Sequence, residues 1–442
     1  MTTTTTTTMT MTTMIDPLPD RSAFGDRTDA VRLLAEAARW TVLDIRLSSF
    51  DARGETFVTG HIVDVVDENG QAAQHTVFLD TASDHPGTVP LESADGERLS
   101  AWLYPADPAL PALAPAVYPD TVRVILERLG LESTAVALDL LSYRPGKRAV
   151  LRTTTTTRTW YLKIVRPDRV EAICSRHSLW REEGVPAPDV VSWSPDGLMV
   201  LAPLPGSEAV GMLDELGDPT GLVSAVAALA GRVALIPSDH PARPSLALRL
   251  DWYRDRLTQF AAGSEPLISE ICDAIARRLA SSAPNPRAVT VHGDLHLGQI
   301  FVDPGDRSRI VGVLDIDTAG LGDPADDAAA LVAHLIASAE LTDRAGRTER
   351  AARTRAVARA FQSSWTRAGD PGFEGRARAI AATHLLGHCL SGSLGADRCL
   401  ALASEMLLHE SALTPVSLPS HGPAEPWEQV AGSDHQEDRS DG

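Results

Sequence analysis

The first part of the chain alternates between hydrophobic and polar residues with a period of two, which is typical of half-buried β-strands. A short helix is expected before this region, at residues 27–39. The sequence Glu-Asn-Gly ending at Gly70 favours a tight turn between two of the strands. The strands are expected at residues 40–50, 55–66, 75–80 and 99–104. We therefore predict a small antiparallel sheet with no cluster of reactive side chains, serving as a cap or an interface.

A second β-rich unit is expected after a proline-rich linker at residues 105–119 and a short helix at 120–130. Its strands are expected at residues 136–143, 149–154, 159–165 and 197–201, with a helix at 169–183. From residue 211 the pattern becomes helical, and the final helices are expected at 326–341, 347–369 and 375–413. The exception is residues 289–317, where two apolar β-type runs flank a polar loop.

These patterns predict an α+β fold with a small β-rich lobe and a large helical lobe, preceded by the antiparallel cap. The expected divisions are a disordered threonine-rich tail (1–20), a cap domain (21–130), an N-lobe with its connector (131–205), a helical C-lobe (206–413) and a disordered acidic tail (414–442).

Composition narrows the kinds of partner. The chain of 442 residues is 43% hydrophobic, and its formal net charge of −19 argues against a nucleic-acid partner, whose phosphates need a basic surface. The four cysteines are scattered, so neither a disulfide framework nor a structural zinc site is expected. With no secretory signal pattern and no apolar window long enough to span a membrane, we expect a cytoplasmic protein without a membrane partner.

The residues that point to chemistry lie between 289 and 329. An apolar strand leads into His292-Gly293-Asp294, and a second apolar run leads into Asp315-Ile316-Asp317. Acidic residues directly after buried strands are held at fixed positions on a rim. Phosphoryl transfer needs one carboxylate to orient the acceptor hydroxyl, and further oxygens to hold Mg²⁺ on the phosphates.

The spacing of Asp294, Gln299 and Asp315 is similar to that of the catalytic aspartate and the two metal ligands of protein kinases. The stretch resembles the HGDxHxGN and IDFDxAxxGDPxxDLA signatures of the aminoglycoside phosphotransferase and choline kinase superfamily. The N-terminal cap and the glutamine at position 299 are similar to maltokinase-like members. The resemblance implies a bilobal protein-kinase-like fold and an ATP-dependent phosphotransferase.

The resemblance also implies roles for single residues. Asp294 would be the catalytic base, with Mg²⁺ held by Gln299 and Asp315. His292 and Asp327 would support the catalytic loop, Asp327 by accepting its backbone N–H groups. Two further residues, His296 and Asp317, are candidates for the substrate side, although His296 also fits a structural role.

On the nucleotide side, Lys163 is a lone lysine on an apolar strand, where the phosphate-contacting lysine of kinase-like lobes lies. Alternatively its ammonium reaches water from an edge strand. Replacing Lys163 by alanine is expected to weaken ATP binding with little loss of stability. Glu171 is the best helix glutamate to pair with it, unless it is an ordinary surface residue. The full set expected to bind the nucleotide is Lys163, Arg144, Gly146, Lys147, Arg148, Leu201 and Ala202. The loop 144–148 is equally compatible with a solvated hairpin turn.

The function expected is transfer of phosphate from ATP to a hydroxyl of a sugar, amino sugar or aminoglycoside, with choline-like or homoserine-like acceptors left open. One alternative is a nucleotide-binding regulatory protein that has lost catalysis, suggested by Gln299 and the unusual phosphate loop. Another is a metal-dependent phosphoesterase, because His292, Asp294 and His296 alternate as metal ligands can.

Overall fold

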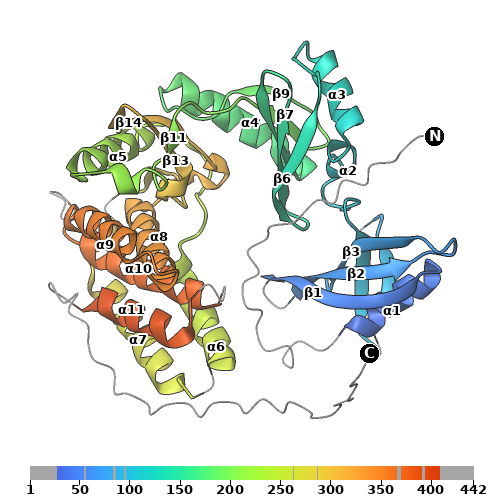
Figure 1. Cartoon of the computed structure of the whole chain (residues 1–442). Coiled ribbons are helices and arrows are strands. Elements are labelled where there is room, and N and C mark those ends of the chain that lie inside the picture. The colour runs from blue at the N-terminus through green and yellow to red at the C-terminus, as the bar shows by residue number, and fades with distance from the viewer. Residues whose placement is uncertain are drawn as a thin grey trace, which may run out of the picture. The chain divides into compact units, whose positions relative to one another are not determined.

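The computed structural model describes residues 27–408, except 54–55, 83–85, 94–95, 262, 286, 366–369 and 391–393 (Figure 1). The tails expected at 1–20 and 414–442 lie outside these residues. Along the described chain, an antiparallel sheet is followed by a second β-rich unit and then by a mainly helical region. This order confirms the α+β architecture expected from the sequence.

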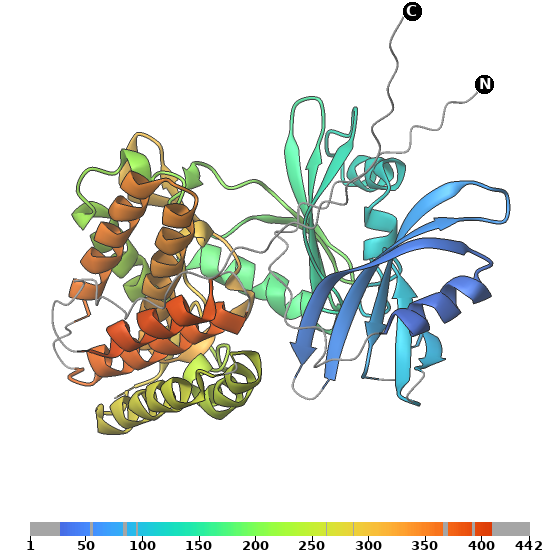
Figure 2. The same ribbon diagram turned by 60° about the horizontal axis from the view of Figure 1, so that its bottom comes forward.

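The N-terminal part is a five-stranded antiparallel sheet in the order β1-β2-β3-β5-β4. Its strands are β1 (Thr41–Arg53), β2 (Thr56–Val66), β3 (Ala72–Asp80), β4 (Val89–Glu92) and β5 (Arg98–Leu103). Because side chains alternate along a strand, Val63 and Val77 lie on the apolar face of the sheet. Helix α1 (Thr28–Ala37) covers this face, and its residue Val31 packs against them (Figure 2). The sequence pattern missed β4, because a four-residue edge strand containing a proline is too short to show a period.

The second sheet has the order β6-β7-β8-β10-β9 and is also antiparallel. Its strands are β6 (Ala137–Arg144), β7 (Arg148–Thr154), β8 (Thr159–Val165), β9 (Val190–Trp193) and β10 (Leu198–Leu201). Helix α4 (Pro167–Glu182) starts with a proline in its first turn, which suits the fixed φ of that residue. Val170 and Ile173 of α4 share a core cluster with Met199 of β10.

The apolar residues of β7 and β8 also pack on two short helices, α2 (Leu113–Ala116) and α3 (Pro119–Arg128). Leu113 and Leu126 of these helices form one buried cluster with Leu151 and Leu162 of the sheet. That cluster includes no residue of β1, β2 or β3. We therefore propose that the division between cap and N-lobe lies between β5 and α2 rather than at residue 130.

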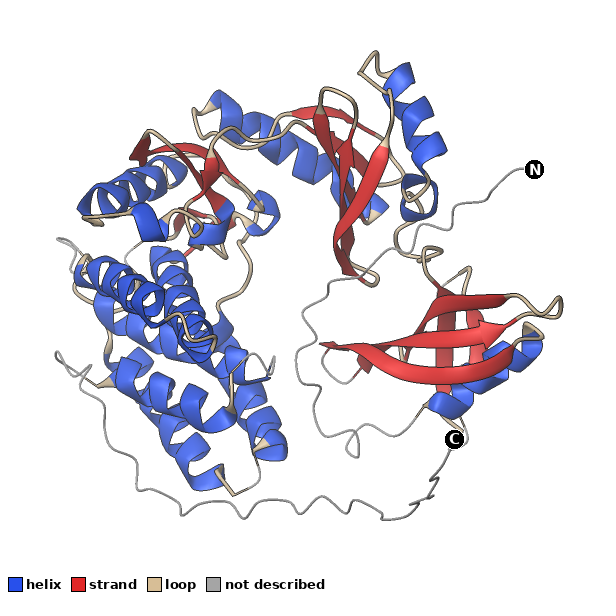
Figure 3. Cartoon of the chain, in the orientation of Figure 1, coloured by secondary structure: helices blue, strands red, loops and turns tan. Residues whose placement is uncertain are grey.

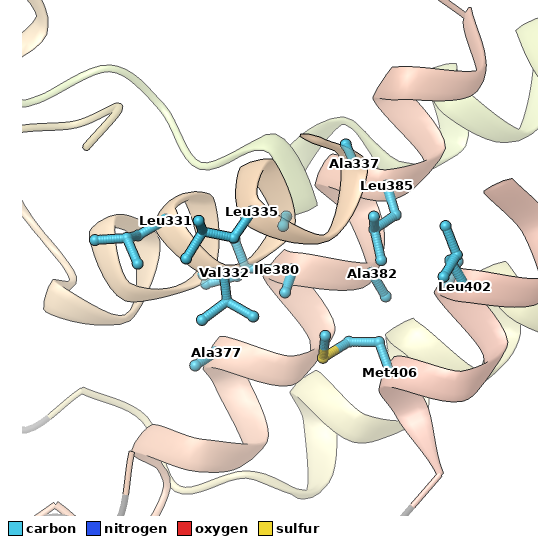
Figure 4. Packing of buried hydrophobic residues seen from close by; sticks show 14 of the residues in the cluster. Leu331, Val332, Leu335, Ala337, Ala377, Ile380, Ala382, Leu385, Leu402 and Met406 are labelled. Atoms are coloured by element: carbon cyan, nitrogen blue, oxygen red, sulfur yellow. The ribbon is translucent and has the colours of Figure 1, made fainter. Parts of the chain in front are cut away.

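The helical region buries the largest core cluster (Figure 4). Its helices are α5 (Thr220–Val233), α6 (Leu250–Phe260), α7 (Glu265–Ser281), α8 (Pro324–Arg344), α9 (Thr348–Ser363), α10 (Phe373–Leu390) and α11 (Ala396–Leu407). Short 3-10 turns precede α5 and α6 at η2 (Leu213–Glu215) and η3 (Leu246–Arg249). The single helix expected at 375–413 is wrong: α10 and α11 are separate, and the sequence Ser-Gly-Ser-Leu-Gly between them disfavours helix.

Two small sheets interrupt the helices (Figure 3). One joins β11 (Ser207–Glu208), β13 (Ile300–Asp303) and β14 (Asp306–Val313). The other pairs β12 (Val289–Val291) with β15 (Gly320–Gly322). The turns η4 (Leu297–Gln299) and η5 (Ile316–Thr318) follow the polar loops of this region. Among the described helices, none has the length and apolarity required for a membrane span.

Candidate active site

The loop after β12 is fixed by a buried carboxylate. Asp327, on the first turn of α8, accepts the backbone N–H groups of His292 and Gly293 at 2.7 Å each. Gly293 has a φ of +84°, and a Cβ there would lie 2.6 Å from the carbonyl oxygen of Thr318. A glycine is therefore required at this position. Burial raises the pKa of Asp327, although the N–H groups it accepts oppose this shift.

His292 ties the same loop to the strand that delivers Asp315. Its Nε2 lies 2.8 Å from the carbonyl oxygen of Leu314, and the ring packs edge-on against Trp180 of α4. The hydroxyl of Thr318 donates to the backbone oxygen of His292 at 3.0 Å. His292 is thus bonded to the residues on either side of Asp315-Ile316-Asp317, which joins the two motifs predicted from the sequence.

Asp294 follows on this fixed loop and is partly exposed, with a side-chain exposure of 29%. Its Oδ2 lies 2.9 Å from Nη1 of Arg243. Arg243 is held by its own backbone, because its N–H donates to the oxygen of Thr318, and the neighbouring Ala242 N–H donates to Leu321 of β15. Sequence reasoning missed Arg243, since it lies in an irregular His-Pro-Ala-Arg-Pro segment with no motif around it.

Asp315 has left-handed backbone geometry, with a φ of +58°, and faces the second sheet. Its Oδ1 accepts from Arg148 at 3.0 Å and from Lys163 at 3.3 Å. Burial alone would raise the pKa of Asp315, but the charges of Lys163 and Arg148 outweigh it and lower the pKa to about 2. Asp315 is therefore ionised throughout the physiological range.

Lys163 is almost fully buried, at 4% exposure, and also pairs with Asp317 at 2.7 Å. Burial by itself would lower its pKa, but Asp317 and Asp315 reverse the effect and raise it. Glu171 is exposed and is not among the groups that act on the Lys163 charge. The two aspartates therefore take the part that the sequence assigned to a helix glutamate.

Gln299 is a buried residue, at 6% exposure, whose side-chain Oε1 accepts no hydrogen bond. Its backbone is bonded on both sides, since its N–H donates to His296 and its oxygen accepts from Leu314. A buried carbonyl oxygen without a partner costs about 1–3 kcal/mol, and a hard cation would satisfy it. Gln299 and the ionised Asp315 are therefore a donor pair that fits Mg²⁺.

The other residues expected to bind the nucleotide lie in two places, the 144–148 segment and the connector. In the loop between β6 and β7, the Gly146 N–H donates to Asp107 at 2.6 Å, and Lys147 pairs with Asp51 of β1. In the 144–148 segment, Arg148 at the start of β7 is thus the residue whose side chain contacts Asp315. At the connector, the Ala202 N–H donates to Asp189, and Leu201 is buried beside Tyr161 in the ladder of β8 and β10. Arg144 is exposed.

The side chain of His296 contacts its own turn and helix α8. Its Nδ1 accepts from the N–H of Gly298 at 3.2 Å, and its ring packs 4.8 Å from that of His334. Within the described residues, no group of three or more histidine, cysteine or acidic side chains is arranged to hold a metal ion. The arrangement required by a metal-dependent phosphoesterase is therefore not found there.

Comparison with known proteins agrees with the family suggested by the sequence. Residues 146–363 match the model of the phosphotransferase enzyme family. A thermostable mutant of the aminoglycoside phosphotransferase APH(4)-Ia, solved with ADP and hygromycin B, is similar over 64% of this chain and 97% of its own, with 13% identity and a TM-score of 0.44. The macrolide 2'-phosphotransferase MphH from Brachybacterium faecium is similar over 66% and 99%, with 19% identity and a TM-score of 0.40. No curated protein matches the chain.

Proposed function

Since residues 146–363 belong to the phosphotransferase enzyme family, we propose that the chain transfers the γ-phosphate of ATP to a hydroxyl of a small molecule of the sugar, amino sugar or aminoglycoside class. The proposal rests on one observation. Asp294 lies on a loop that Asp327 holds, and His292 of that loop is bonded to the strand leading to Asp315, which is itself paired with Lys163. Phosphoryl transfer depends mainly on positioning and electrostatic stabilisation, which fixed groups of these types supply.

Asp294 is the residue proposed to act on the acceptor. Asp327 and His292 hold its loop through 2.7 and 2.8 Å hydrogen bonds, so the carboxylate has a defined position. It orients the attacking hydroxyl and accepts its proton as the bond from that oxygen to the γ-phosphorus forms and the bond from the γ-phosphorus to the oxygen that leaves with ADP breaks. The acceptor hydroxyl must share Asp294 with Arg243, which lies 2.9 Å away.

The nucleotide end of the site is proposed to lie at Asp315. Bound Mg²⁺ neutralises charge on the phosphates. The residues that would hold it are Asp315, through a charged oxygen, and Gln299, through its unpartnered amide oxygen. Lys163 and Arg148, both bonded to Asp315, are the cations available to bind phosphate oxygens.

The test is nucleotide consumption by the purified chain with Mg²⁺ and a panel of sugars, amino sugars and aminoglycosides. For Asp294→Asn we expect unchanged ATP binding and a fall in turnover of about 10²-fold or more, because the amide cannot take the proton. Asp306→Asn is the matched control, since Asp306 is an exposed aspartate of the nearby β14 strand. Near wild-type turnover in Asp294→Asn would show that Asp294 does not accept the proton of the acceptor hydroxyl. ATP binding without turnover of any acceptor would instead favour the regulatory alternative.

A further inference from the structure

Helix α4 is bonded to η5, the turn that follows the proposed metal ligand. Its Arg176 donates from Nη1 to the backbone oxygen of Asp317 at 2.8 Å, and the backbone oxygen of Ile316 lies 3.4 Å from the same nitrogen. The oxygen of Thr318, the next residue, accepts the backbone N–H of Arg243. Three consecutive carbonyl groups of this turn are therefore held by residues from two distant segments of the chain.

The guanidinium of Arg176 is itself oriented by a histidine. Its Nη2 lies 2.5 Å from Nε2 of His240. Because arginine only donates hydrogen bonds, this nitrogen of His240 accepts, and the proton of the neutral ring is on Nδ1. That Nδ1 lies 3.1 Å from Oδ1 of Asp239, which accepts from it. His240 belongs to the segment that brings Arg243 to Asp294, so Arg176 is held between η5 and that segment.

The same face of α4 also packs on this region. Trp180 lies four residues after Arg176, which is about one turn along the helix. It shares a buried cluster with Ile316 and Ala319, and its ring is edge-on to that of His292 in the catalytic loop. Helix α4 therefore contacts both motif segments through an arginine and a tryptophan.

Asp315 depends on contacts of this kind because its backbone is in the left-handed region, with φ +58° and ψ +40°. A residue with a side chain rarely adopts this conformation, which persists only where surrounding contacts fix it. On one side, the N–H of Leu314 donates to the backbone oxygen of Gln299. On the other side, Arg176 holds the carbonyl groups that follow. The peptide groups before and after Asp315 are thus both fixed.

The partners of Arg176 also differ from those of the other cations near Asp315. Lys163 and Arg148 are paired with carboxylates, whose place a phosphate oxygen could take. The hydrogen bonds of Arg176 go to backbone oxygens and to an imidazole. These bonds fit a residue that fixes the turn rather than one that contacts phosphate.

Building on the phosphotransferase function and the Mg²⁺ site proposed above, we propose that Arg176 is a positioning residue for that metal site. It holds η5 so that the carboxylate of Asp315 keeps the direction needed to bind the cation. Loss of Arg176 weakens Mg²⁺ binding and leaves the nucleotide contacts of Lys163 and Arg148 in place. The role lies outside the motif residues, since Arg176 is on α4 and Asp315 is 139 residues later in the chain.

The first experiment measures the affinity of the full chain for a non-hydrolysable ATP analogue, once with Mg²⁺ and once with EDTA. In the wild type, Mg²⁺ should strengthen binding, because Asp315 holds the cation against the phosphates. In Arg176→Met this gain should fall by about tenfold, as for other residues that orient a metal ligand, while the affinity in EDTA changes by less than about twofold. An unchanged gain overturns the inference. An equal loss of affinity with Mg²⁺ and with EDTA also overturns it, because general damage to the sheet would have that effect.

Two milder variants carry the test if Arg176→Met does not fold. Arg176→Lys keeps one donor for the backbone of η5 but loses the planar fork that also reaches His240, so it should lose less of the Mg²⁺ gain than Arg176→Met. His240→Ala removes the acceptor for Nη2 and should reduce the gain by about threefold. If both variants keep the full wild-type gain, the inference is wrong. Arg166→Met is the matched control, because Arg166 is an exposed arginine beside α4 that is bonded to Asp168, and it should keep the gain.

The two proposals can fail separately. If Mg²⁺ strengthens binding to the wild type and Arg176→Met keeps that gain, the phosphotransferase function stands and only the role of Arg176 is removed. If the wild type does not bind the analogue, or if Mg²⁺ adds nothing to its affinity, the proposed function loses its nucleotide or metal site, and the role of Arg176 is lost with it.

Discussion

At the scale of single residues, Lys163 is expected to contribute more to the stability of the fold than the sequence indicates. The sequence predicts little loss of stability in Lys163→Ala, but the ammonium is buried between Asp315 and Asp317. Removing one partner of such a set leaves buried charges uncompensated, at a cost of about 3 kcal/mol or more. The structure therefore argues against that expectation.

We predict that Lys163→Met lowers both nucleotide affinity and thermal stability. Adding Asp317→Asn to this variant removes the uncompensated carboxylate, so the double variant should recover stability and still bind nucleotide weakly. Thermal melts and nucleotide titrations of both single variants and the double variant measure the coupling. Full stability of Lys163→Met alone would mean that the ion pairs contribute nothing to the fold.

For Gln299, we expect replacement to weaken function without lowering stability. Its Oε1 is buried without a partner, which costs free energy in the metal-free protein. We expect Gln299→Leu to leave the melting temperature unchanged or raise it, while the Mg²⁺ concentration for half-maximal turnover rises roughly tenfold. The measurement is the Mg²⁺ dependence of turnover beside thermal melts. An unaltered metal requirement would take Gln299 out of the metal site.

At the scale of elements, the first turn of α8 combines two acidic residues with different roles. Asp327 accepts N–H groups of the catalytic loop, whereas burial raises the pKa of its neighbour Asp326 to about 6, with the charges of Asp323 and Asp327 adding to the shift. Since the folded pKa lies above the unfolded value, the stability linked to Asp326 is fully present below about pH 4 and is lost as the pH rises through about 6. The amount is on the order of 3 kcal/mol.

We therefore predict that Asp326→Asn flattens the pH dependence of stability. Its melting temperature should differ less between about pH 4 and about pH 8 than that of the wild type, because asparagine has no proton to lose. Asp120→Asn, an exposed aspartate in the first turn of α3, serves as the control. A wild-type pH profile in Asp326→Asn would contradict the raised pKa.

The helices and strands also differ in whether the sequence could predict them. The helix α4 and the strands of both larger sheets other than β4 and β9 were located from the sequence pattern. It did not find β9 or β15, which are four and three residues long, because such strands are defined by pairing with distant partners. It joined α10 to α11 because both are rich in alanine and leucine.

The same division holds for the candidate site. Asp294, Gln299, Asp315 and Asp327 lie in one stretch with motif spacing, so the sequence could collect them. Arg243 and Arg176 are brought to that stretch by tertiary packing alone. No pattern around them distinguishes them from surface arginines.

At the scale of the whole molecule, apolar clusters and ion pairs both join the second β-rich unit to the helical region. Trp180 of α4 shares a buried cluster with Leu229 of α5 and Val313 of β14. The helical region has one large apolar core, whereas the second sheet has separate clusters on its two faces. The helical region and the second sheet are linked by charged contacts from Arg148 and Lys163 to Asp315 and Asp317. These contacts involve the groups proposed to bind nucleotide and metal, so ligand binding and lobe contact depend on the same residues.

The packing of α3 on the second sheet has a practical consequence for anyone who dissects the protein. The family match starts at residue 146, in the turn after β6, so a fragment cut to that boundary would lose β6, α2 and α3. Strand β7 would become an unprotected edge, and Leu151 and Leu162 would face water. The region that matches the family model is thus smaller than the unit that packs together, and a fragment that keeps this packing must begin before α2.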